Sequence, residues 1–251
     1  MRYFFDTNVL ADFGRDANTQ RRLDQALRHG VSFAIAPPIF TELVRGLINN
    51  AAAQFASNQR VFKWFHRNQF EILALPKPFI ALQMKTKLAG PPGVQPKHYA
   101  ELIEMLATSD DFDHFIRKAE EDGSNWRGIA DQPNVHQSQL DKEFAALPEV
   151  AATGRDNVAR SICSWFGVPG CRPNYLLLSR RFSAALEFLE STFRKVKCGA
   201  KPRKNDPGLY IDFQLLLYLG DEGLSFLSNE NFGNEIQKSP QRQRIVPLAS
   251  L

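Results

Sequence analysis

The sequence is poor in residues that cross-link a chain or ligate zinc. It contains three cysteines, Cys163, Cys171 and Cys198, and no CxxC pair. An odd number without such a pair argues against a disulfide framework and favours a reducing, cytoplasmic compartment. No two of the five histidines are spaced three to five residues apart, so a structural zinc site has little support.

Long apolar runs are also missing. No stretch approaches the roughly 18–20 uninterrupted apolar residues that a membrane-spanning helix needs. The opening segment MRYFFDTNVLADFG places Asp6 where the apolar centre of an export signal would lie, so we expect a strand of the mature fold there. Low-complexity tracts and internal repeats are absent. We therefore expect a globular protein without membrane contact.

Charge is unevenly distributed along the chain. The net charge is +4, but residues 98–150 hold 12 acidic residues against 4 Lys/Arg, whereas residues 151–204 hold 11 Lys/Arg against 3 acidic residues. This pattern suggests an acidic layer beside a basic one, and the basic layer would suit a phosphate backbone. Two solvated helix faces would give the same pattern.

Strands alternate with helices at the start of the chain. The strands are predicted at residues 2–5, 31–36 and 70–75, and the helices at 18–29, 39–48, 55–67 and 77–89. Gly30 is well placed to cap the first of these helices, and the breaker Gly90-Pro91-Pro92-Gly93 ends the last. This rhythm is typical of a parallel sheet built from βαβ units.

The alternation stops between residues 96 and 200. Helices are expected there at 98–107, 109–121, 138–146 and 175–195, with no convincing strand. It returns with a helix at 207–219 and strands at 224–227 and 244–248. We therefore predict an α/β core formed by residues 1–92 and 205–251, interrupted by a helical insertion at 93–204.

Acidic and amide side chains follow several of the core elements. They are Asp6 and Asn8 after the first strand, Glu42 on the helix after the second, Asp212 in the segment LYIDFQLLLYL, and Ser228, Asn229 and Glu230 after the strand LSFL. Ligands of a parallel α/β sheet bind outside the carboxyl ends of its strands, so the first and last groups should converge. Grouped carboxylates repel one another unless a cation neutralises them, and oxygen ligands select Mg²⁺ or Mn²⁺. Such ions suit phosphodiester hydrolysis by activated water.

Each of these residues also has a simpler explanation when it is taken alone. Asp6 fits a turn or a helix cap. Glu42 fits an exposed helix residue or an ion pair with Arg45, and Glu230 fits an acid in a loop. Asp212 is harder to explain in this way, because apolar residues flank it on both sides and a buried charge needs a partner.

The order of the segments resembles that of the PIN-domain ribonucleases, a family that includes many toxins of bacterial toxin–antitoxin pairs. YFFDTNVLADF is similar to the family's opening strand with its Asp-Thr/Ser-Asn-Val-Leu motif, and IAPPIFTELVRGL to the helix with Glu-Leu-x-x-Gly. LALPKPFIALQMKTKLA resembles the third strand and its helix. DFQLLLYLGDEGLSFLSNENF resembles the closing helix, Gly turn, strand and Thr-x-Asp/Asn ending. The resemblance covers residues 1–89 and about 205–248.

The spacing within the last motif matters for the choice of the third acid. Ser228 follows Asp212 by 16 residues, which is the spacing that the family commonly has between these positions. The resemblance therefore selects Asp212 over Asp206 as the third acid. Asp206 has a simpler explanation as a helix N-cap, because Pro207 follows it at the favoured first helical position.

The ending of the motif departs from the family. Ser228 stands where Thr is usual, Glu230 stands where Asp or Asn is usual, and Phe232 comes early. The fourth ligand therefore stays open among Asn229, Glu230 and Asn231. The insertion makes the chain longer than the compact toxins, so a toxin role does not follow from the resemblance.

The resemblance implies a three-layer α/β/α fold with a central parallel sheet of four to five strands and a mostly helical insertion. It implies that Asp6, Glu42 and Asp212 hold one or two Mg²⁺ or Mn²⁺ ions, with Glu230 as a further catalytic contributor. The expected reaction is hydrolysis of a phosphodiester, RNA being favoured, to a 3′-hydroxyl and a 5′-phosphate.

Neighbouring polar residues have supporting roles under the same resemblance. Asn8, Ser228 and Asn229 would orient a carboxylate or the attacking water through hydrogen bonds. A basic segment runs into the helix of the third acid and would bring a nucleic-acid backbone to the metal; its residues are Arg194, Lys195, Lys197, Lys201, Arg203 and Lys204. A solvated linker explains the segment equally well. An antitoxin-like protein and a second copy of the chain are the other expected partners.

Two other classes of protein compete with this reading. Haloacid-dehalogenase-like phosphatases also place an Asp after the first strand, but they require another Asp two residues later, where this chain has Asn8. A PIN-like fold without activity, which binds RNA or a protein partner, is the second alternative, and the altered last motif is its main support. Asp6, Glu42 and Asp212 argue against it.

Overall fold

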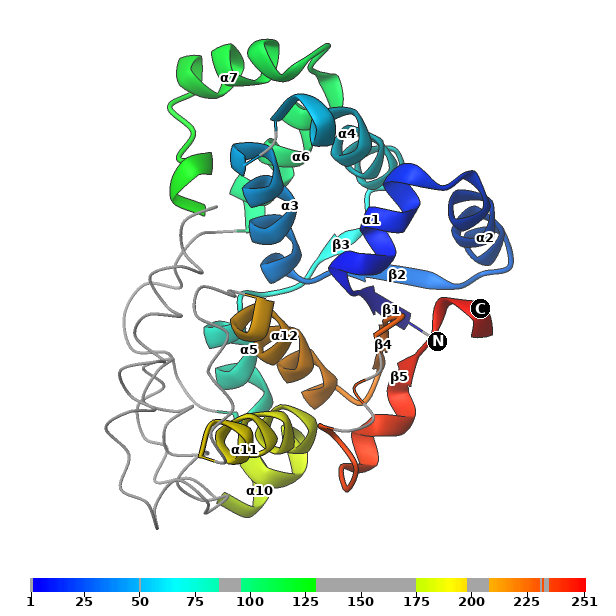
Figure 1. Ribbon diagram of the computed structural model, residues 1–251, viewed down its shortest axis with the longest axis vertical. Coiled ribbons are helices and arrows are strands. Elements are labelled where there is room, and N and C mark those ends of the chain that lie inside the picture. The colour runs from blue at the N-terminus through cyan, green and yellow to red at the C-terminus, as the bar shows by residue number, and fades with distance from the viewer. Residues whose placement is uncertain are drawn as a thin grey trace.

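A computed structural model describes residues 2–49, 51–85, 96–129, 175–197, 208–230, 232 and 235–251. Within these ranges a five-stranded parallel sheet has the strand order β3-β2-β1-β4-β5 (Figure 1). Its strands are β1 (Arg2–Phe5), β2 (Ser32–Ile35), β3 (Glu71–Ile72), β4 (Leu224–Leu227) and β5 (Ile245–Val246). The predicted α/β class and the parallel sheet are therefore confirmed.

The helices agree with most of the predicted segments. They are α1 (Thr7–Arg15), α2 (Ala17–Arg28), α3 (Pro37–Asn49), α4 (Ala51–Asn68), α5 (Pro76–Gln83), α6 (Pro96–Thr108), α7 (Phe112–Glu121), α10 (Tyr175–Arg181), α11 (Ser183–Lys197) and α12 (Gly208–Leu217), with short 3₁₀ helices η2 (Tyr218–Gly220), η4 (Pro240–Arg244) and η5 (Leu248–Ser250). The predicted helix at 138–146 and the Gly90–Gly93 breaker lie outside the described residues, as do Asp206 and Pro207. In the described parts of 96–200 there is no strand, as expected.

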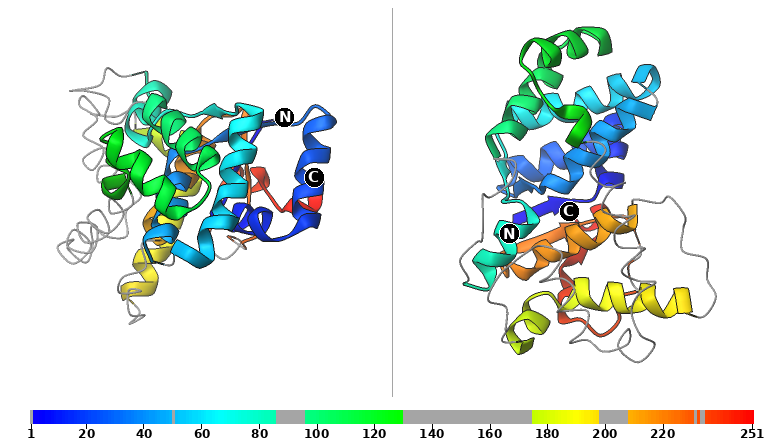
Figure 2. Two further views of the ribbon diagram at one scale, coloured as in Figure 1. Left: turned by 90° about the horizontal axis from the view of Figure 1, so that it is seen from above. Right: turned by 90° about the vertical axis from the view of Figure 1, so that its left-hand side faces the viewer.

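Both faces of the sheet are covered by helices. Successive residues of β1 point to opposite faces, and both are fully buried: Phe5 contacts Trp64 of α4, with ring centroids 5.6 Å apart, whereas Phe4 stacks on Phe226 of β4 at 4.8 Å. Helices α1, α2 and α4 lie on one side of the sheet, and α5, α11 and α12 lie on the other (Figures 1 and 2). A strand that is buried on both faces is apolar throughout, which explains the run Tyr3-Phe4-Phe5.

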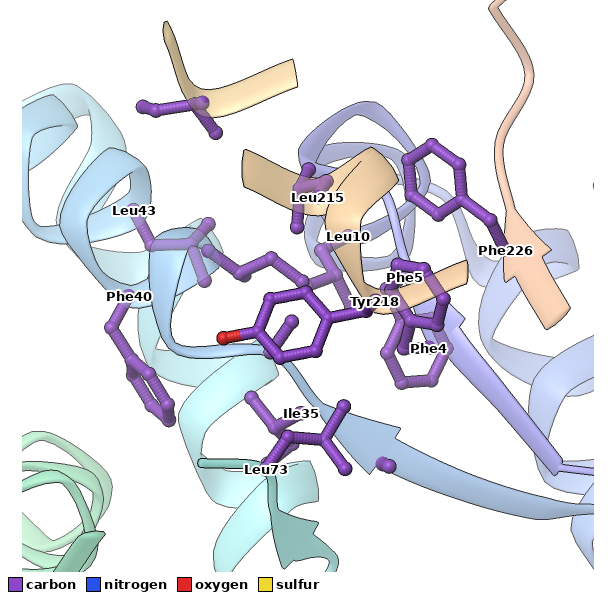
Figure 3. Close-up of a cluster of buried hydrophobic side chains, with 14 of the residues drawn as sticks. Phe4, Phe5, Leu10, Ile35, Phe40, Leu43, Leu73, Leu215, Tyr218 and Phe226 are labelled. Atoms are coloured by element: carbon purple, nitrogen blue, oxygen red, sulfur yellow. The ribbon is translucent and has the colours of Figure 1, made fainter. Parts of the chain in front are cut away.

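Tyr218 lies at the centre of the apolar interior, where Figure 3 shows it among Phe4, Leu10, Leu215 and Phe226. Its side chain is fully buried, and its hydroxyl donates a hydrogen bond to the carbonyl oxygen of Ala74 at 2.7 Å. Burial raises the pKa of Tyr218 well above its usual value, so the hydroxyl stays neutral. The interior thus holds its polar group uncharged and paired.

Helix α1 is an addition to the predicted elements. It starts at Thr7, directly after β1, although Asp-Thr-Asn fits a turn equally well in the sequence. The helix packs closely on α4 at Gly14, where a Cβ atom would lie 2.4 Å from Ser57 Oγ and 2.6 Å from its carbonyl oxygen. This long-range contact fixes the helix, and local sequence carries no sign of it.

The helix predicted at 175–195 is two helices, α10 and α11, separated at Phe182. Gln241 stabilises the break: its amide nitrogen donates to the carbonyl oxygen of Arg181 at 2.6 Å, and its amide oxygen accepts from the Ala184 N–H at 2.9 Å. Helix α11 packs on α12 and η4, and α6 packs on α4. Among the described helices, none is long and apolar enough to cross a membrane.

Candidate active site at the carboxyl edge of the sheet

The register of β1 and β4 brings the first candidate residues together. Phe5 pairs with Leu227, so the residues that follow, Asp6 and Ser228, leave the sheet side by side. The Asp6 N–H donates to the Leu227 carbonyl oxygen at 2.8 Å, and the Ser228 hydroxyl donates to Asp6 Oδ2 at 2.5 Å. Both side chains are buried, with 3% and 2% exposed. Residues 222 positions apart thus form one buried pair.

The position of this pair is the one that the topology favours for a ligand. Strand β1 lies between β2 and β4, and the chain leaves it toward β2 while the return strand β4 joins its other edge. In an open parallel sheet the crevice for a ligand forms where the strand order reverses, outside the carboxyl ends of the strands. Asp6 and Ser228 lie at that point.

The surroundings of Asp6 disfavour the charged form of its carboxyl group. Its pKa is raised from 3.8 to about 7, mainly because burial disfavours the charged form, and the neighbouring carboxylates of Glu230 and Glu42 raise it further. The hydrogen bond from Ser228 acts in the opposite direction. Asp6 occupies the N-cap position of α1, but its side chain makes no capping hydrogen bond there. The backbone N–H of Asn8 lowers the pKa of Asp6 and is the smallest of the groups that act on it. A bound cation would relieve both the burial penalty and the repulsion.

Glu42 reaches the same edge from the next strand. It lies on α3, which begins directly after β2, and its side chain is half-buried. The Thr7 hydroxyl at the start of α1 donates a hydrogen bond to Glu42 Oε2. Thr7 was not a predicted site residue. It follows Asp6 directly in the sequence, and this position is the signal that would have identified it.

Glu230 reaches Asp6 from the segment after β4. The Asn8 side-chain amide donates a hydrogen bond to Glu230 Oε1, and both side chains are exposed. The Glu230 N–H donates to the Ser228 hydroxyl at 3.0 Å, so this hydroxyl links Glu230 to Asp6. Asn8 and Ser228 thus each donate to a carboxylate of the site.

Asn229 is oriented differently. Its amide nitrogen donates to Asp12 Oδ2 of α1 at 3.4 Å, and its amide oxygen accepts from the Leu248 N–H at 3.2 Å. These contacts attach the segment after β4 to α1 and to the C-terminal end of the described chain. Asn229 therefore positions the backbone that carries Glu230, and its amide is engaged away from Asp6.

Asp212 lies on the helix next to Glu42. It is half-buried on α12, which packs against α3, and it takes part in an interaction of its own. Among the described residues, the groups that shift the pKa of Asp6 are Ser228, Glu230, Glu42 and Asn8, and Asp212 is not one of them. The predicted third acid therefore lies on the element next to Glu42 and does not act on the pKa of Asp6, whereas Glu230 does.

The donor set at this edge suits a hard cation with bound water. Asp6, Glu42 and Glu230 offer carboxylate oxygens, which Mg²⁺ and Mn²⁺ prefer. In the described part of the chain, however, no three His, Cys, Asp or Glu side chains are grouped closely enough to hold an ion together. Mg²⁺ commonly uses one or two carboxylates and keeps several waters, so these residues fit an ion centred on Asp6 better than a closed cage.

The predicted basic segment is described only in part. Arg194 is exposed near the end of α11, and the Lys195 ammonium forms an ion pair with Glu235 at 2.5 Å. Lys197 ends α11. Lys201, Arg203 and Lys204 lie outside the described residues.

The chain matches no protein-family model, no curated protein and no solved structure. The resemblance to the PIN-domain ribonucleases therefore stays a prediction carried by the motifs and by the geometry of the site.

Proposed function

We propose that this chain is a divalent-metal-dependent nuclease of the PIN type, which hydrolyses phosphodiester bonds and favours RNA. The observation that carries the proposal is the state of Asp6, a carboxylate at the switch point of a parallel sheet. Its burial, together with the neighbouring carboxylates of Glu230 and Glu42, raises its pKa to about 7. Perturbed acids of this kind are concentrated at functional sites. Structural ion pairs also shift pKa values, but the two charged groups acting on Asp6 are both acidic and give it no compensation.

The residues divide into ligands and groups that orient them. Asp6 would hold the cation, with Glu42 or Glu230 as its partner, and a bound cation would supply Lewis acidity toward the phosphate and lower the pKa of water. Ser228 holds Asp6 Oδ2 in one orientation, and Thr7 and Asn8 hold the two glutamates. Asp212 would face the substrate from α12 and complete the acidic set.

Cleavage of labelled RNA and single-stranded DNA oligonucleotides, with Mn²⁺ or Mg²⁺ and with chelator, tests the proposal. We expect cleavage that chelator abolishes and that the Asp6→Asn protein loses by more than about a hundred-fold. Replacing a residue that only orients a ligand typically costs about 10–100-fold, so Ser228→Ala should fall within that range. Asp212→Asn tests whether the third acid belongs to the site.

Asp113→Asn is the matched control, because Asp113 is an exposed acid in the first turn of α7. It should keep full activity. Cleavage that survives both Asp6→Asn and Asp212→Asn would disprove the mechanism, because the activity would then belong to another site or another protein.

A catalytically inactive PIN-like module that binds RNA or a protein is the second candidate. The absence of a ready-made three-ligand group among the described residues favours it. Calorimetric titration with Mn²⁺ separates the two functions: a nuclease should bind Mn²⁺ in a manner that Asp6→Asn abolishes, whereas an inactive module should show no such binding.

A further inference from the structure

The excess positive charge of the described chain is concentrated in the helices on one side of the sheet. Residues 7–28 and 51–68, which include α1, α2 and α4, hold seven Arg/Lys and three acidic residues, whereas the other described residues hold 16 Arg/Lys and 18 acidic residues. The three helices lie on the same side of the sheet (Figures 1 and 2). This side of the protein is therefore basic.

Six of these cations are exposed on α2 and α4, and we call them the basic face: Arg21, Arg22, Arg28, Arg60, Lys63 and Arg67. The Arg28 side chain donates to the Asp24 carbonyl oxygen at 3.3 Å, and the Lys63 ammonium donates to the Gln59 amide oxygen at 3.1 Å. Both acceptors are uncharged and lie one turn earlier in the same helix. Within the described residues, neither Arg28 nor Lys63 forms an ion pair.

Three acidic residues offset part of the charge on this side. Asp24 forms an ion pair with Arg67 at 3.4 Å, and Asp16, the N-cap of α2, interacts electrostatically with Arg21. Asp12 is exposed on α1. With all three counted, the cations on this side still outnumber the acids by more than two to one. The surface therefore attracts anions.

Contacts between neighbouring helices make the basic face continuous. Near the end of α4, Trp64 Nε1 donates to Asp24 Oδ1 at 2.8 Å, and Arg67 donates to the same oxygen at 3.4 Å. Earlier in α4, the Arg60 guanidinium donates to the Gly14 carbonyl oxygen at 2.9 Å, three residues before α2 begins. Arg60 and Arg67 are separated by roughly 10.5 Å of helix, which is about three nucleotides of a nucleic-acid strand.

The composition of the basic face favours phosphates over a lipid surface. Five of its six cations are arginine, whose guanidinium binds phosphate oxygens in pairs. Helices that bind membrane surfaces also bury an apolar face in lipid. Among the described residues, Leu82 is the exposed large apolar side chain, and it lies on α5, on the other side of the sheet. A polyanion in solution is therefore the matching partner.

The basic face begins close to the candidate active site. Gly14, which Arg60 contacts, follows Asp6 by eight residues along α1. At 1.5 Å of rise per residue this distance is roughly 12 Å, or about four nucleotides of a strand. A nucleic acid with a phosphodiester at Asp6 can therefore continue onto the basic face, and this position favours a nucleic acid over an acidic protein.

We infer that the basic face binds the phosphate backbone of the nucleic-acid substrate, with Arg28, Arg60 and Lys63 contacting phosphates. The inference rests on the proposed nuclease function and adds the surface along which the substrate runs. Because every nucleotide carries a phosphate, these contacts position the strand without reading its bases. Arg67 contributes less, because Asp24 offsets its charge.

Binding of a fluorescent 15-nucleotide single-stranded RNA, measured by anisotropy in chelator, tests the inference without cleavage. Arg28→Ala/Lys63→Ala removes two phosphate contacts, which contribute about 1.4 to the slope of log affinity against log salt. The variant should lose that slope and bind about 25-fold more weakly at 0.1 M salt. Both side chains are exposed and bond within their own helices, so the fold should be unaffected.

Arg180→Ala/Arg242→Ala is the matched control for charge. These two arginines are exposed on α10 and η4, on the other side of the sheet. The control should keep both the affinity and the slope. Equal weakening by the two double variants would overturn the inference, because binding would then follow net charge alone.

Asp24→Asn gives a result that misfolding cannot imitate. It frees Arg67 and keeps an oxygen that accepts from Trp64, so binding should become about five-fold tighter at 0.1 M salt, with a slope steeper by about 0.7. Asp113→Asn, which removes a charge from α7, should change neither quantity. Unchanged or weaker binding by a folded Asp24→Asn protein would overturn the inference.

Two further measurements separate the basic face from its alternatives. Co-sedimentation with phosphatidylserine vesicles that Arg28→Ala/Lys63→Ala abolishes, with RNA binding unchanged, would assign the face to a membrane and overturn the inference. Cleavage in Mn²⁺ is measured separately, so equal RNA binding by all variants beside normal cleavage would overturn the inference and leave the nuclease proposal intact. RNA binding that depends on the face, without cleavage, would support the face and overturn the nuclease proposal.

Discussion

Two buried polar side chains near the same strand have different surroundings. Tyr218 contacts Phe4 in the middle of β1, whereas Asp6 follows the end of the same strand. The Tyr218 hydroxyl is neutral and donates to the Ala74 carbonyl oxygen. Asp6 accepts one hydrogen bond from Ser228, but two acidic neighbours oppose its ionisation. The Tyr218 hydroxyl in the interior therefore has a favourable partner, whereas the Asp6 carboxylate at the edge of the sheet has neighbours that oppose its charge.

This difference separates a polar group that is compatible with a stable fold from one that opposes it. A buried carboxylate with acidic neighbours lowers the stability of the metal-free fold, and such conflicts are expected at functional sites. The following variants test the contrast.

Phe4→Ala should have the largest effect. Phe4 is fully buried and contacts both Phe226 and Tyr218, so its truncation removes apolar contact and leaves a cavity. We expect the free energy of unfolding to fall by about 3–5 kcal/mol in urea titration. Leu82→Ala is the control: Leu82 is 69% exposed, and its loss should change stability by less than about 0.5 kcal/mol. Similar effects of the two variants would contradict the described interior.

Asp6→Asn should stabilise the metal-free protein, and the gain should depend on pH. The pKa of Asp6 in the fold, about 7, lies above its ordinary 3.8, so the folded state holds an extra proton between these values. The stability of the wild-type protein therefore falls as pH rises from about 4 to 7 and is constant above. The advantage of Asn should grow from near zero at pH 4 to at most about 4 kcal/mol at pH 8.

Urea titrations in chelator at several pH values measure this advantage, and Asp113→Asn, at an exposed position of α7, serves as the matched control. If Asp6→Asn were destabilising at pH 8, the charged Asp6 carboxylate would stabilise the fold, as the Tyr218 hydroxyl does. The contrast between the two side chains would then disappear. Saturating Mn²⁺ should narrow the difference between the two proteins, because the ion stabilises only the state that binds it.

Tyr218→Phe should have a smaller effect that does not depend on pH. The variant keeps the ring and leaves the Ala74 carbonyl oxygen without its donor, which costs about 1–3 kcal/mol in a buried site. Because burial raises the pKa of Tyr218 well above its usual value, the loss should be constant from about pH 5 to 9. A loss that varied within this range would show that the tyrosine ionises and that the interior resembles the edge.

The sequence predicted the elements whose signals are local. The apolar runs at 2–5, 31–36 and 224–227 are strands because each is buried in the centre of a parallel sheet. The elements it mispredicted depend on distant residues. Helix α1 is held on α4 where Gly14 meets Ser57, and the break between α10 and α11 is stabilised by Gln241, which is 57 residues from Ala184.

The site shows the same division. Placing Asp6 near Ser228 required only parallel strands in neighbouring positions, and the register fulfils it. The orientations of single side chains were not predictable. Thr7 donates to Glu42, and Asn229 turns to Asp12, because these contacts depend on how α1 lies against α3 and against the segment after β4. Spacing alone cannot specify such angles.

Asn8→Ala should have the smallest effect on stability and separates support of the site from support of the fold. Asn8 and Glu230 are both exposed, so the loss of their hydrogen bond should change the free energy of unfolding by about 0.5 kcal/mol or less. If Glu230 helps to hold the ion, Mn²⁺ affinity measured by calorimetry should nevertheless fall about ten-fold, as it does when the partner of a ligand is removed. Asn18→Ala, an exposed residue of α2, should change neither quantity. Unchanged Mn²⁺ affinity in Asn8→Ala would show that Glu230 is not a metal ligand. Glu42 would then be the partner of Asp6, because Glu42 and Glu230 are the carboxylates that raise the pKa of Asp6 among the described residues.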